Sequence, residues 1–534
     1  MKRIVHSIFA LTMLLGVTGL SAQSRYLDDV FQRSEIKVSS DIIYGINFNE
    51  YAPPSIGGPQ LLPLQCDIYE PDPAIDTVTD RPVVIYFHTG SFLPKGLVSP
   101  MGEKTDSAAV EICTRFAEKG YVAISAAYRV GWLANSTNLD LRRGTNLLAV
   151  YLALQDAKTA VRFVRKTVAV DGNPYGVDPD DIALVGQGSG GYVVLAYGSV
   201  DKYNEVTGFS KFQYDQSGTG IYGQTVAAGD PYIDTSRVGD WDGYGGVVTL
   251  TGNTTPLNLP EVDLTAPGRN FINHPGYSND VRMTMNLGGA LGDSAWQEAG
   301  DPALVATHCR FDFYAPYYRG MVQVPVGGQF FPVVEVAGSH TAVKNANSLG
   351  NNANLINANF QDPISVMARN NQYNIGNEEN ILTFNIMPPN PALPFQVNSN
   401  PWDWWDPADT LGANETNPNI KSQSLAYIDT VMNYFVPRLA AELNAAGRDI
   451  SVAEEVSPSF GIYPNPVNNQ LQINGIDQRE LKAAVVRDMS GKVILRRAFA
   501  NGQSRLDVSA IKPGAYLIEI ITSKGSAVQK FVKE

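Results

Sequence analysis

The sequence predicts an α/β fold, a doubly wound and mostly parallel sheet, followed by a small all-β sandwich domain. Three observations support this fold class. Strand-like apolar runs alternate with amphipathic helical stretches from about residue 35 to 447, short alternating runs separated by glycines begin near Gly461, and 534 residues exceed what one hydrophobic core usually holds. We therefore expect a first domain at residues 23–447, a linker at 448–460 and a second domain at 461–534.

Each element of the first domain is predicted from its apolar pattern. Continuous apolar runs indicate buried strands, and one-sided apolar spacing indicates helices. The expected order is strand 81–87, helix 110–119, strand 121–127, helix 147–168, strand 181–186, an aperiodic insertion or lid at 203–278, strands 281–287, 303–308 and 331–336, and a closing helix at 425–443. Residues 331–336 are the expected last strand of the sheet.

The N-terminus has the pattern of a secretory signal peptide, residues 1–22. Lys2 and Arg3 precede an apolar run, and Leu20-Ser21-Ala22 forms a small-residue cleavage site. The apolar run is shorter than the roughly 20 residues that a membrane span needs, and no later stretch reaches that length. We expect an exported protein without a transmembrane span.

Charge excludes two classes of partner. The net charge is −13, and residues 461–534 carry eleven Lys and Arg against six Asp and Glu, which leaves −20 for residues 23–460. So acidic a surface repels nucleic acids and anionic membranes. Neither is an expected partner.

Neither the cysteines nor any sequence motif predicts a bound metal or cofactor. The three cysteines, Cys66, Cys113 and Cys309, allow at most one internal disulfide and form no metal knuckle, so burial is their expected role. The sequence has no glycine-rich phosphate loop, zinc motif or spaced Ca²⁺ loop. No cofactor or metal is expected.

The first chemical motif, His88-Thr89-Gly90-Ser91, follows a buried strand. It resembles the His-Gly-Gly-Gly motif of carboxylesterases and lipases, with Thr89 and Ser91 in place of two glycines. That resemblance implies that the N–H groups of Gly90 and Ser91 belong to an oxyanion hole, with His88 as part of the motif. The alternative is an ordinary turn after a strand.

The resemblance extends to the α/β-hydrolase family over about 350 residues, through the segments 120–131, 154–164 and 177–181. The nucleophile elbow of these enzymes is Gly-x-Ser-x-Gly, because small residues on both sides let a strand and a helix pack around a strained turn. Here Gly186 and Gly190 flank Gly188, which has no side chain to attack a substrate. With Gly188 at the nucleophile position, the N–H of Ser189 would join the oxyanion hole. In the alternative register Ser189 is itself the nucleophile, but Gln187 then stands where a small residue is needed.

The resemblance also implies an acid and a base. Asp312, in Thr307-His308-Cys309-Arg310-Phe311-Asp312, matches the position of the hydrolase acid, and His340, after the expected last strand, matches that of the base. The alternative for His340 is a structural loop histidine. If the nucleophile alone is missing, Gly188→Ser is expected to create weak esterase activity with His340 as base.

A tryptophan-rich segment, Trp402-Asp403-Trp404-Trp405-Asp406, has two interpretations. It could form a sugar-stacking platform with acidic hydrogen-bond acceptors, or it could wedge a lid against the core.

The C-terminal residues resemble another family. Tyr463-Pro464-Asn465-Pro466, Asp488-Met489-Ser490-Gly491-Lys492 and Pro513-Gly514-Ala515-Tyr516 are similar to motifs of the type IX secretion system sorting domain. This implies that the type IX machinery is a partner and that the protein reaches the outer-membrane surface or the medium. The alternative is an accessory β-sandwich that binds carbohydrate.

Three hypotheses for function follow. The first is a carboxylesterase-like surface protein that has lost its nucleophile and binds a small molecule, glycan or protein through the old active-site cleft. The second is an active secreted serine esterase that uses Ser189. The third is a structural surface-assembly protein.

Overall fold

The computed structural model describes residues 24–52, 57–97, 100–326, 329–404, 419–443, 460–477, 479–488, 492–499, 503–522 and 525–534. The chain divides into two compact units, one of Arg25–Ser451 and one that contains Val452–Glu534. The predicted signal peptide and, except for Phe460, the predicted linker lie outside the described residues.

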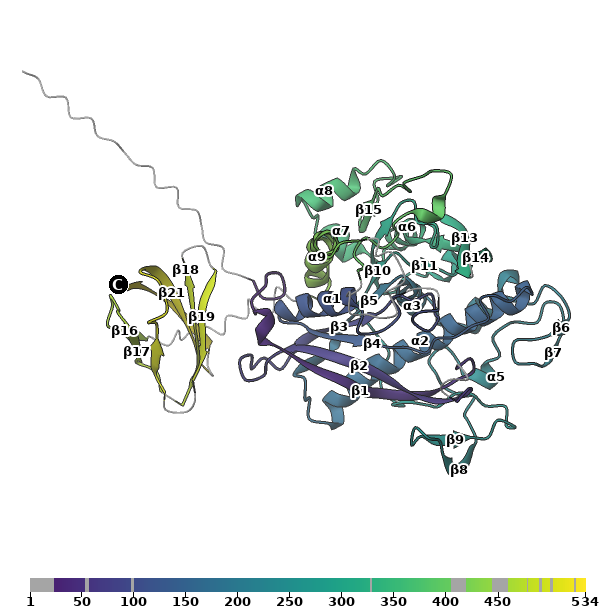
Figure 1. Ribbon diagram of the computed structural model, residues 1–534, viewed down its shortest axis with the longest axis horizontal. Helices are drawn as coiled ribbons and strands as arrows, with labels where there is room; N and C mark the ends of the chain where they lie inside the picture. Colours follow the sequence, from purple (N-terminus) through teal and green to yellow (C-terminus); the bar gives the residue numbers. More distant parts are fainter. Residues whose placement is uncertain are drawn as a thin grey trace, which may run out of the picture. The chain divides into compact units, whose positions relative to one another are not determined.

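An eight-stranded, mostly parallel sheet forms the centre of the larger unit, which confirms the predicted fold class (Figure 1). In spatial order its strands are β1 (Ile36–Asn49), β2 (Gln60–Pro71), β4 (Val122–Ala126), β3 (Arg81–Phe87), β5 (Val177–Gln187), β10 (Met283–Leu287), β12 (Ala303–Cys309) and β15 (Ile381–Phe384). The pairs β1–β2 and β2–β4 are antiparallel, and the other pairs are parallel. Every residue of β3, β4, β10 and β12 is buried, as expected of parallel strands covered on both faces.

Helices cover both faces of this sheet. Alternate side chains of β3 point to opposite faces, so Val83 and Ile85 pack in a core with helices α2 (Leu139–Val170) and α3 (Ser189–Tyr197). Val84 and Tyr86 pack in a second core with α1 (Ser107–Glu118) and α9 (Lys421–Glu442). Helix α2 begins eight residues before the prediction, because the Asn138 side chain caps its polar first turn by accepting hydrogen bonds from the N–H groups of Asp140 and Leu141.

Residues 203–278 add no strand to the large sheet. They contain short helices, α4 (Tyr203–Thr207) and α5 (Thr235–Val238), and two separate two-stranded sheets. These sheets are β6–β7 (Gly218–Thr219 and Thr225–Val226) and β8–β9 (Leu250–Thr254 and Pro260–Val262). The lack of periodicity in this segment therefore reflects short, locally paired elements.

The prediction of the last strand was wrong. Residues 331–336 lie in β14 (Gln329–Gly338), which pairs with β13 (Arg319–Val326) and β11 (Ala290–Leu291) in a separate three-stranded sheet. The last strand of the large sheet is β15, four residues long. An apolar run predicts that a strand forms but does not identify its partner, and β14 pairs with the strand just before it through a hairpin. Between β14 and β15 lie α6 (Ser339–Leu349), α7 (Ala353–Asn357) and α8 (Pro363–Arg369).

The smaller unit contains two antiparallel sheets, which confirms a small all-β domain. One consists of β16 (Gly461–Tyr463), β17 (Gln470–Asn474) and β20 (Arg505–Asp507), and the other of β19 (Val493–Ala498), β18 (Leu481–Asp488), β21 (Gly514–Thr522) and β22 (Gly525–Lys533). Leu471 of one sheet and Val486, Ile518 and Phe531 of the other share a core.

All three cysteines are buried and free. Burial raises the pKa of each thiol, which makes it a poor nucleophile and metal ligand. Among the residues with assigned positions, no helix has the length and apolar character that crossing a bilayer requires. The same residues contain no cluster of acidic, histidine or cysteine side chains suited to a metal ion.

Candidate active site

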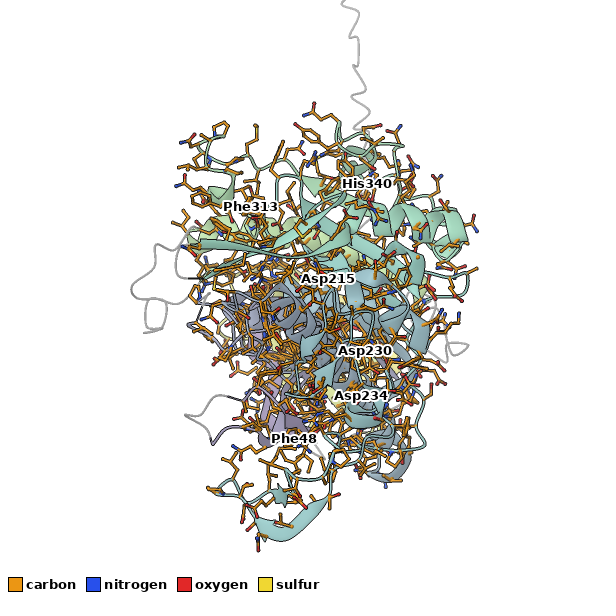
Figure 2. The ribbon with its side chains drawn as sticks, turned by 90° about the vertical axis from the view of Figure 1, so that its right-hand side faces the viewer. Phe48, Asp215, Asp230, Asp234, Phe313 and His340 are labelled. Carbon is orange, nitrogen blue, oxygen red and sulfur yellow. The ribbon has the colours of Figure 1, made fainter. Side chains whose placement is uncertain are left out.

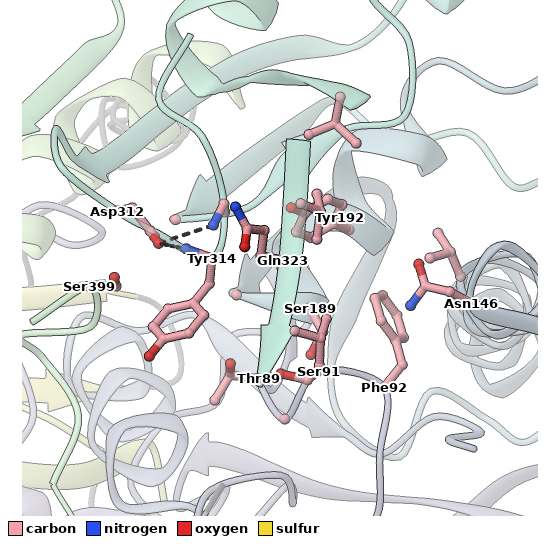
Figure 3. A pocket seen from close by; sticks show the side chains of 18 of the residues that line it. Thr89, Ser91, Phe92, Asn146, Ser189, Tyr192, Asp312, Tyr314, Gln323 and Ser399 are labelled. Carbon is pink, nitrogen blue, oxygen red and sulfur yellow. Dashed lines mark hydrogen bonds between the residues drawn. The ribbon is translucent and has the colours of Figure 1, made fainter. Parts of the chain in front are cut away.

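A cavity of about 410 Å³ lies at the carboxyl ends of the central strands, where open α/β sheets bind ligands. Figure 3 shows Asp312 and Ser399 on one side of it and Phe92 and Asn146 on the other. Apolar side chains from β13, β14 and neighbouring elements form much of the wall, including Phe212, Trp296, Val322, Val324, Val334 and Val336. The cavity thus has a polar floor and an apolar wall.

Gly188 is the turn residue between β5 and α3. Its φ of 53° and ψ of −114° place it in a conformation that glycine adopts freely. The flanking glycines permit a very close crossing, because a Cβ atom on Gly186 would lie 2.0 Å from the Gly190 carbonyl oxygen and one on Gly190 would lie 2.1 Å from that of Phe87. This geometry is that of a strand–turn–helix elbow with Gly188 at its apex.

Thr89 fills the space that a side chain at position 188 would need. A Cβ atom built on Gly188 would lie 2.2 Å from Thr89 Oγ1 and 3.0 Å from Thr89 Cβ. Both residues line the cavity (Figure 3). Nothing in the sequence pattern indicated this contact, because Thr89 and Gly188 come from different loops.

Ser189 lies in the first turn of α3 and is 5% exposed. Its Oγ atom is 2.9 Å from the Tyr128 hydroxyl, which itself donates to the His88 carbonyl at 2.8 Å. Because the phenol has one proton, the Ser189 hydroxyl donates to the Tyr128 oxygen. No histidine accepts this proton.

The loop after β3 presents unpaired N–H groups. Gly90, Ser91 and Phe92 all have positive φ, of 127°, 57° and 57°. The carbonyl of Gly90 accepts from Leu93 N–H, and that of Ser91 accepts from Trp132 Nε1 at 2.9 Å. Within the part of the chain that the structure describes, the amides of Gly90, Ser91 and Ser189 make no hydrogen bond, and all three residues line the cavity.

His88 supports this loop from behind. Its ring stacks on Tyr128 with centroids 4.5 Å apart, and its Nδ1 lies 2.6 Å from the Thr89 carbonyl oxygen. Burial lowers the pKa of His88, so the ring is neutral. His88 does not line the cavity.

Asp312 follows β12 and is the cavity's buried acid. Its carboxylate accepts hydrogen bonds from the N–H groups of Tyr314 at 2.8 Å and Ala315 at 3.0 Å (Figure 3). Burial raises the pKa of Asp312 to about 7, although these N–H groups and the Ser399 hydroxyl lower it. Its Oδ2 lies 3.6 Å from His308 Nε2.

The structure does not bring His340 to Asp312. His340 lies at the start of α6, its Nε2 is 3.1 Å from the Ile375 carbonyl oxygen, and its ring packs against Tyr317 and Tyr318. Figure 2 labels His340 and Phe313 at different places in the larger unit. The expected acid–base pair is therefore wrong, because β14 belongs to the separate sheet and the turn after it does not lead to the cavity.

Two family models match parts of the chain. Residues 461–534 match the Secretion system C-terminal sorting domain, and residues 66–222 match the BD-FAE family. Residues 66–222, within the larger unit, are thus similar to an α/β-hydrolase family, and residues 461–534 are similar to a type IX sorting domain. We call the larger unit the esterase-like domain. Both resemblances predicted from the sequence are thus confirmed, and the sorting domain indicates export to the cell surface or the medium.

The individual proteins that this chain resembles have low sequence identity to it. A "Neuroligin-like protein glit-1" from Caenorhabditis elegans is 27% identical over 127 residues, which are 24% of this chain and 14% of that protein. Propionate-bound esterase Est2 from Thermogutta terrifontis is 17% identical with a TM-score of 0.26, covering 54% of this chain and 76% of its own. MGS-M1, an α/β-hydrolase from a deep-sea metagenome, is 17% identical with a TM-score of 0.20, covering 32% of this chain and 53% of its own.

The esterase-like domain also contains a serine–histidine contact that the sequence did not reveal. Ser339 Oγ lies 2.5 Å from His308 Nδ1, and His308 Nε2 lies 3.0 Å from the Ala315 carbonyl oxygen. A carbonyl can only accept, so Nε2 carries the proton of the neutral ring. The one proton of the Ser339 hydroxyl has two acceptors within reach, His308 Nδ1 and the Gly289 carbonyl oxygen at 2.9 Å. Both side chains are fully buried and neither lines the cavity, so this contact supports the fold and has no access to a substrate.

A second carboxyl of the esterase-like domain lies under the elbow. Asp403 accepts a 2.6 Å hydrogen bond from Gln187 Nε2, and Tyr86 donates to Gln187 Oε1. Burial raises the pKa of Asp403 to about 7. The adjacent Trp402 and Trp404 are 0% and 7% exposed, so they pack in the core and offer no sugar-stacking surface. Trp405 and Asp406 lie outside the described residues.

Proposed function

We propose that this protein is an exported, non-catalytic hydrolase homologue that binds a small amphipathic ester or carboxylic acid in the cavity of its esterase-like domain. The observation that carries the proposal is the filled nucleophile site, where Thr89 Oγ1 lies 2.2 Å from the position of a Cβ atom on Gly188. The lack of a nucleophile thus involves two loops, because Gly188 has no side chain and Thr89 occupies the space that one would need.

Acyl transfer by a serine hydrolase needs a nucleophile and a base that takes its proton. Gly188 offers no nucleophile, and Ser189 Oγ is bonded to Tyr128. None of the residues with described positions that line the cavity is a histidine. These observations favour binding over the alternative of an active esterase that uses Ser189.

The ligand class follows from the groups that remain. The unpaired amides of Gly90, Ser91 and Ser189 are suited to an acyl oxygen, and the last of them lies at the N-terminus of α3, where negative charge is favoured. The apolar wall, with Trp296, Val322 and Val334, is suited to the hydrocarbon part of the same molecule. A glycan or a protein segment fits this narrow, partly apolar cavity less well.

Two measurements test the proposal on purified full-length protein. An alkyl fluorophosphonate should leave the protein unlabelled, and isothermal titration should detect binding of a medium-chain carboxylate such as octanoate.

Ser189→Pro, which removes the amide proton at a helix position that accepts proline, should weaken binding roughly tenfold or more, while Ser189→Ala should change it little. Fluorophosphonate labelling of Ser189 would establish the active esterase instead. Failure to bind any acid or ester would leave surface assembly as the better hypothesis.

We further propose that the sorting domain takes the protein through the type IX machinery to the outer-membrane surface. Deleting residues 461–534 should trap the esterase-like domain in the periplasm in a folded state, because the two units have separate cores. Cell fractionation and limited proteolysis check this. Truncated protein on the cell surface would refute it.

A further inference from the structure

We infer that Ser399 stands where the base of a hydrolase triad would stand, beside the retained acid Asp312. This assignment goes beyond the proposed function and does not depend on which ligand the cavity holds. It identifies the base position on the loop after β15, a residue that no sequence motif marks.

The order of the strands limits where in the chain a catalytic base could lie. In an α/β-hydrolase the nucleophile, acid and base occur in that chain order. Gly188 follows β5 and Asp312 follows β12, and among the described residues β15 is the strand of the large sheet that comes later in the chain, so we look for the third position in the loop after β15. That loop runs from Asn385 and returns to the cavity, which it lines with residues 396–400 and Asp403. Residues 385–404 contain no histidine.

Within this loop, the position of its side chain makes Ser399 the candidate for the base position. Its side chain is 5% exposed and lines the cavity, and its hydroxyl lies close enough to the Asp312 carboxyl to lower the pKa of that group (Figure 3). Ser399 Oγ has no hydrogen bond of ordinary geometry to a described residue. The other groups that contact the carboxylate, the two backbone amides and His308, belong to the β12 side.

The size of Ser399 is consistent with a vacated base. A serine is much smaller than an imidazole, and the neighbouring volume is part of the cavity. Asp312, which would orient an imidazole, has a side chain that is 3% exposed and a carboxyl near the Ser399 hydroxyl. The same loop also provides Asp403, which is engaged by Gln187 and supplies a matched control carboxyl.

The first experiment places a histidine at position 399 of the full-length protein. With ¹³C-labelled histidine, the ring of Ser399→His is titrated by NMR alone and in combination with Asp312→Asn or Asp403→Asn. If position 399 faces Asp312, Asp312→Asn should lower the pKa of the introduced imidazole by about one unit or more, because an adjacent carboxylate favours the charged ring. Asp403→Asn should lower it less. An imidazole whose titration is unchanged by Asp312→Asn overturns the inference.

A smaller probe keeps the test decisive if the histidine variant does not fold. Ser399→Cys is nearly isosteric, and the three native cysteines are buried. The rate of iodoacetamide alkylation against pH gives the pKa of the introduced thiol, which a nearby carboxylate should raise. Adding Asp312→Asn should lower that pKa by about one unit and increase the alkylation rate near neutral pH several-fold. An unchanged profile overturns the assignment as well.

Discussion

The elbow side of the cavity and the acid side are built on the same sheet, but they depart from the hydrolase arrangement in different ways. On the elbow side, the backbone of a strand–turn–helix is retained around Gly188, and a neighbouring side chain, Thr89, fills the missing residue's space. On the acid side, Asp312 lines the cavity, while the expected base, His340, lies at the start of α6, which follows a strand of the separate three-stranded sheet. The elbow thus differs from the hydrolase pattern in the residue at its apex, and the acid side differs in the element that carries the expected base.

The comparison teaches which parts of a site depend on local sequence. At the elbow, the close contact between Gly186 and Gly190 joins residues four positions apart, and the glycine spacing indicates it, whereas the contacts with Phe87 and Thr89 come from a distant part of the chain. The acid side depends on which strand ends the sheet, and that is a long-range property. The following predictions test this difference, from the largest expected effect to the smallest.

The elbow backbone should tolerate no added atom. Gly186→Ala should lower the free energy of unfolding by about 3 kcal/mol or prevent folding, because its Cβ atom would lie 2.0 Å from the Gly190 carbonyl oxygen. Gly218→Ala, where nothing lies within 4 Å, is the control and should change stability by less than about 0.5 kcal/mol. Urea denaturation compares the two. Equal, small losses would mean that the elbow is looser than described.

The buried carboxyl of Asp312 should make the free energy of unfolding depend on pH. Because burial raises the pKa of Asp312 from 3.8 to about 7, the folded protein keeps a proton that the unfolded chain releases between these values. Stability from this group is therefore present below pH 4 and lost as the pH rises toward 7.

Asp312→Asn should remove this dependence, with a difference from wild type on the order of 3 kcal/mol between pH 4 and pH 8. His308, whose pKa burial lowers to about 4, contributes the opposite trend, and because its Nε2 lies 3.6 Å from Asp312 Oδ2 this contribution is fitted in each protein separately. Denaturation curves at several pH values check this. Parallel curves for the two proteins would show that Asp312 titrates normally.

Filling position 188 should be costly and should not restore catalysis. Gly188→Ser should destabilise the esterase-like domain by about 2 kcal/mol, because its Cβ atom meets Thr89 and φ is positive. Adding Thr89→Gly should recover about 1 kcal/mol in a double-mutant cycle.

We therefore now expect no esterase activity in Gly188→Ser, since none of the described residues that line the cavity is a histidine that could serve as base. Hydrolysis of p-nitrophenyl butyrate should stay at the wild-type level. Activity in the single variant that is lost with His340→Ala would show that His340 does serve as the base.

The smallest effect is expected at His340. His340→Ala should cost about 1 kcal/mol of stability through its bond to the Ile375 carbonyl and its contacts with Tyr317 and Tyr318. Its affinity for octanoate should stay within about twofold of wild type, because His340 does not line the cavity. Calorimetry measures both quantities. A large loss of affinity would place His340 in the binding site.

The sequence by itself determined the elements whose signals are short-range. Period-two and continuous apolar runs identified the central strands, since a buried strand must be apolar whatever its partners. The glycine spacing at 186, 188 and 190 identified the elbow because only residues without side chains fit so close a crossing. The β-sandwich with its sorting motifs was equally evident.

The tertiary structure alone decided contacts between residues far apart in the chain. Thr89 lies against Gly188, and Ser399 and Asp312 line the same cavity, although the members of each pair come from loops of different strands. The four-residue strand β15 is too short to be recognised by periodicity, so the longer apolar run at 331–336 was mistaken for the end of the sheet. Strand pairing depends on the packing energy of the whole sheet, and a local pattern contains no information about which of two apolar segments gains more by joining it.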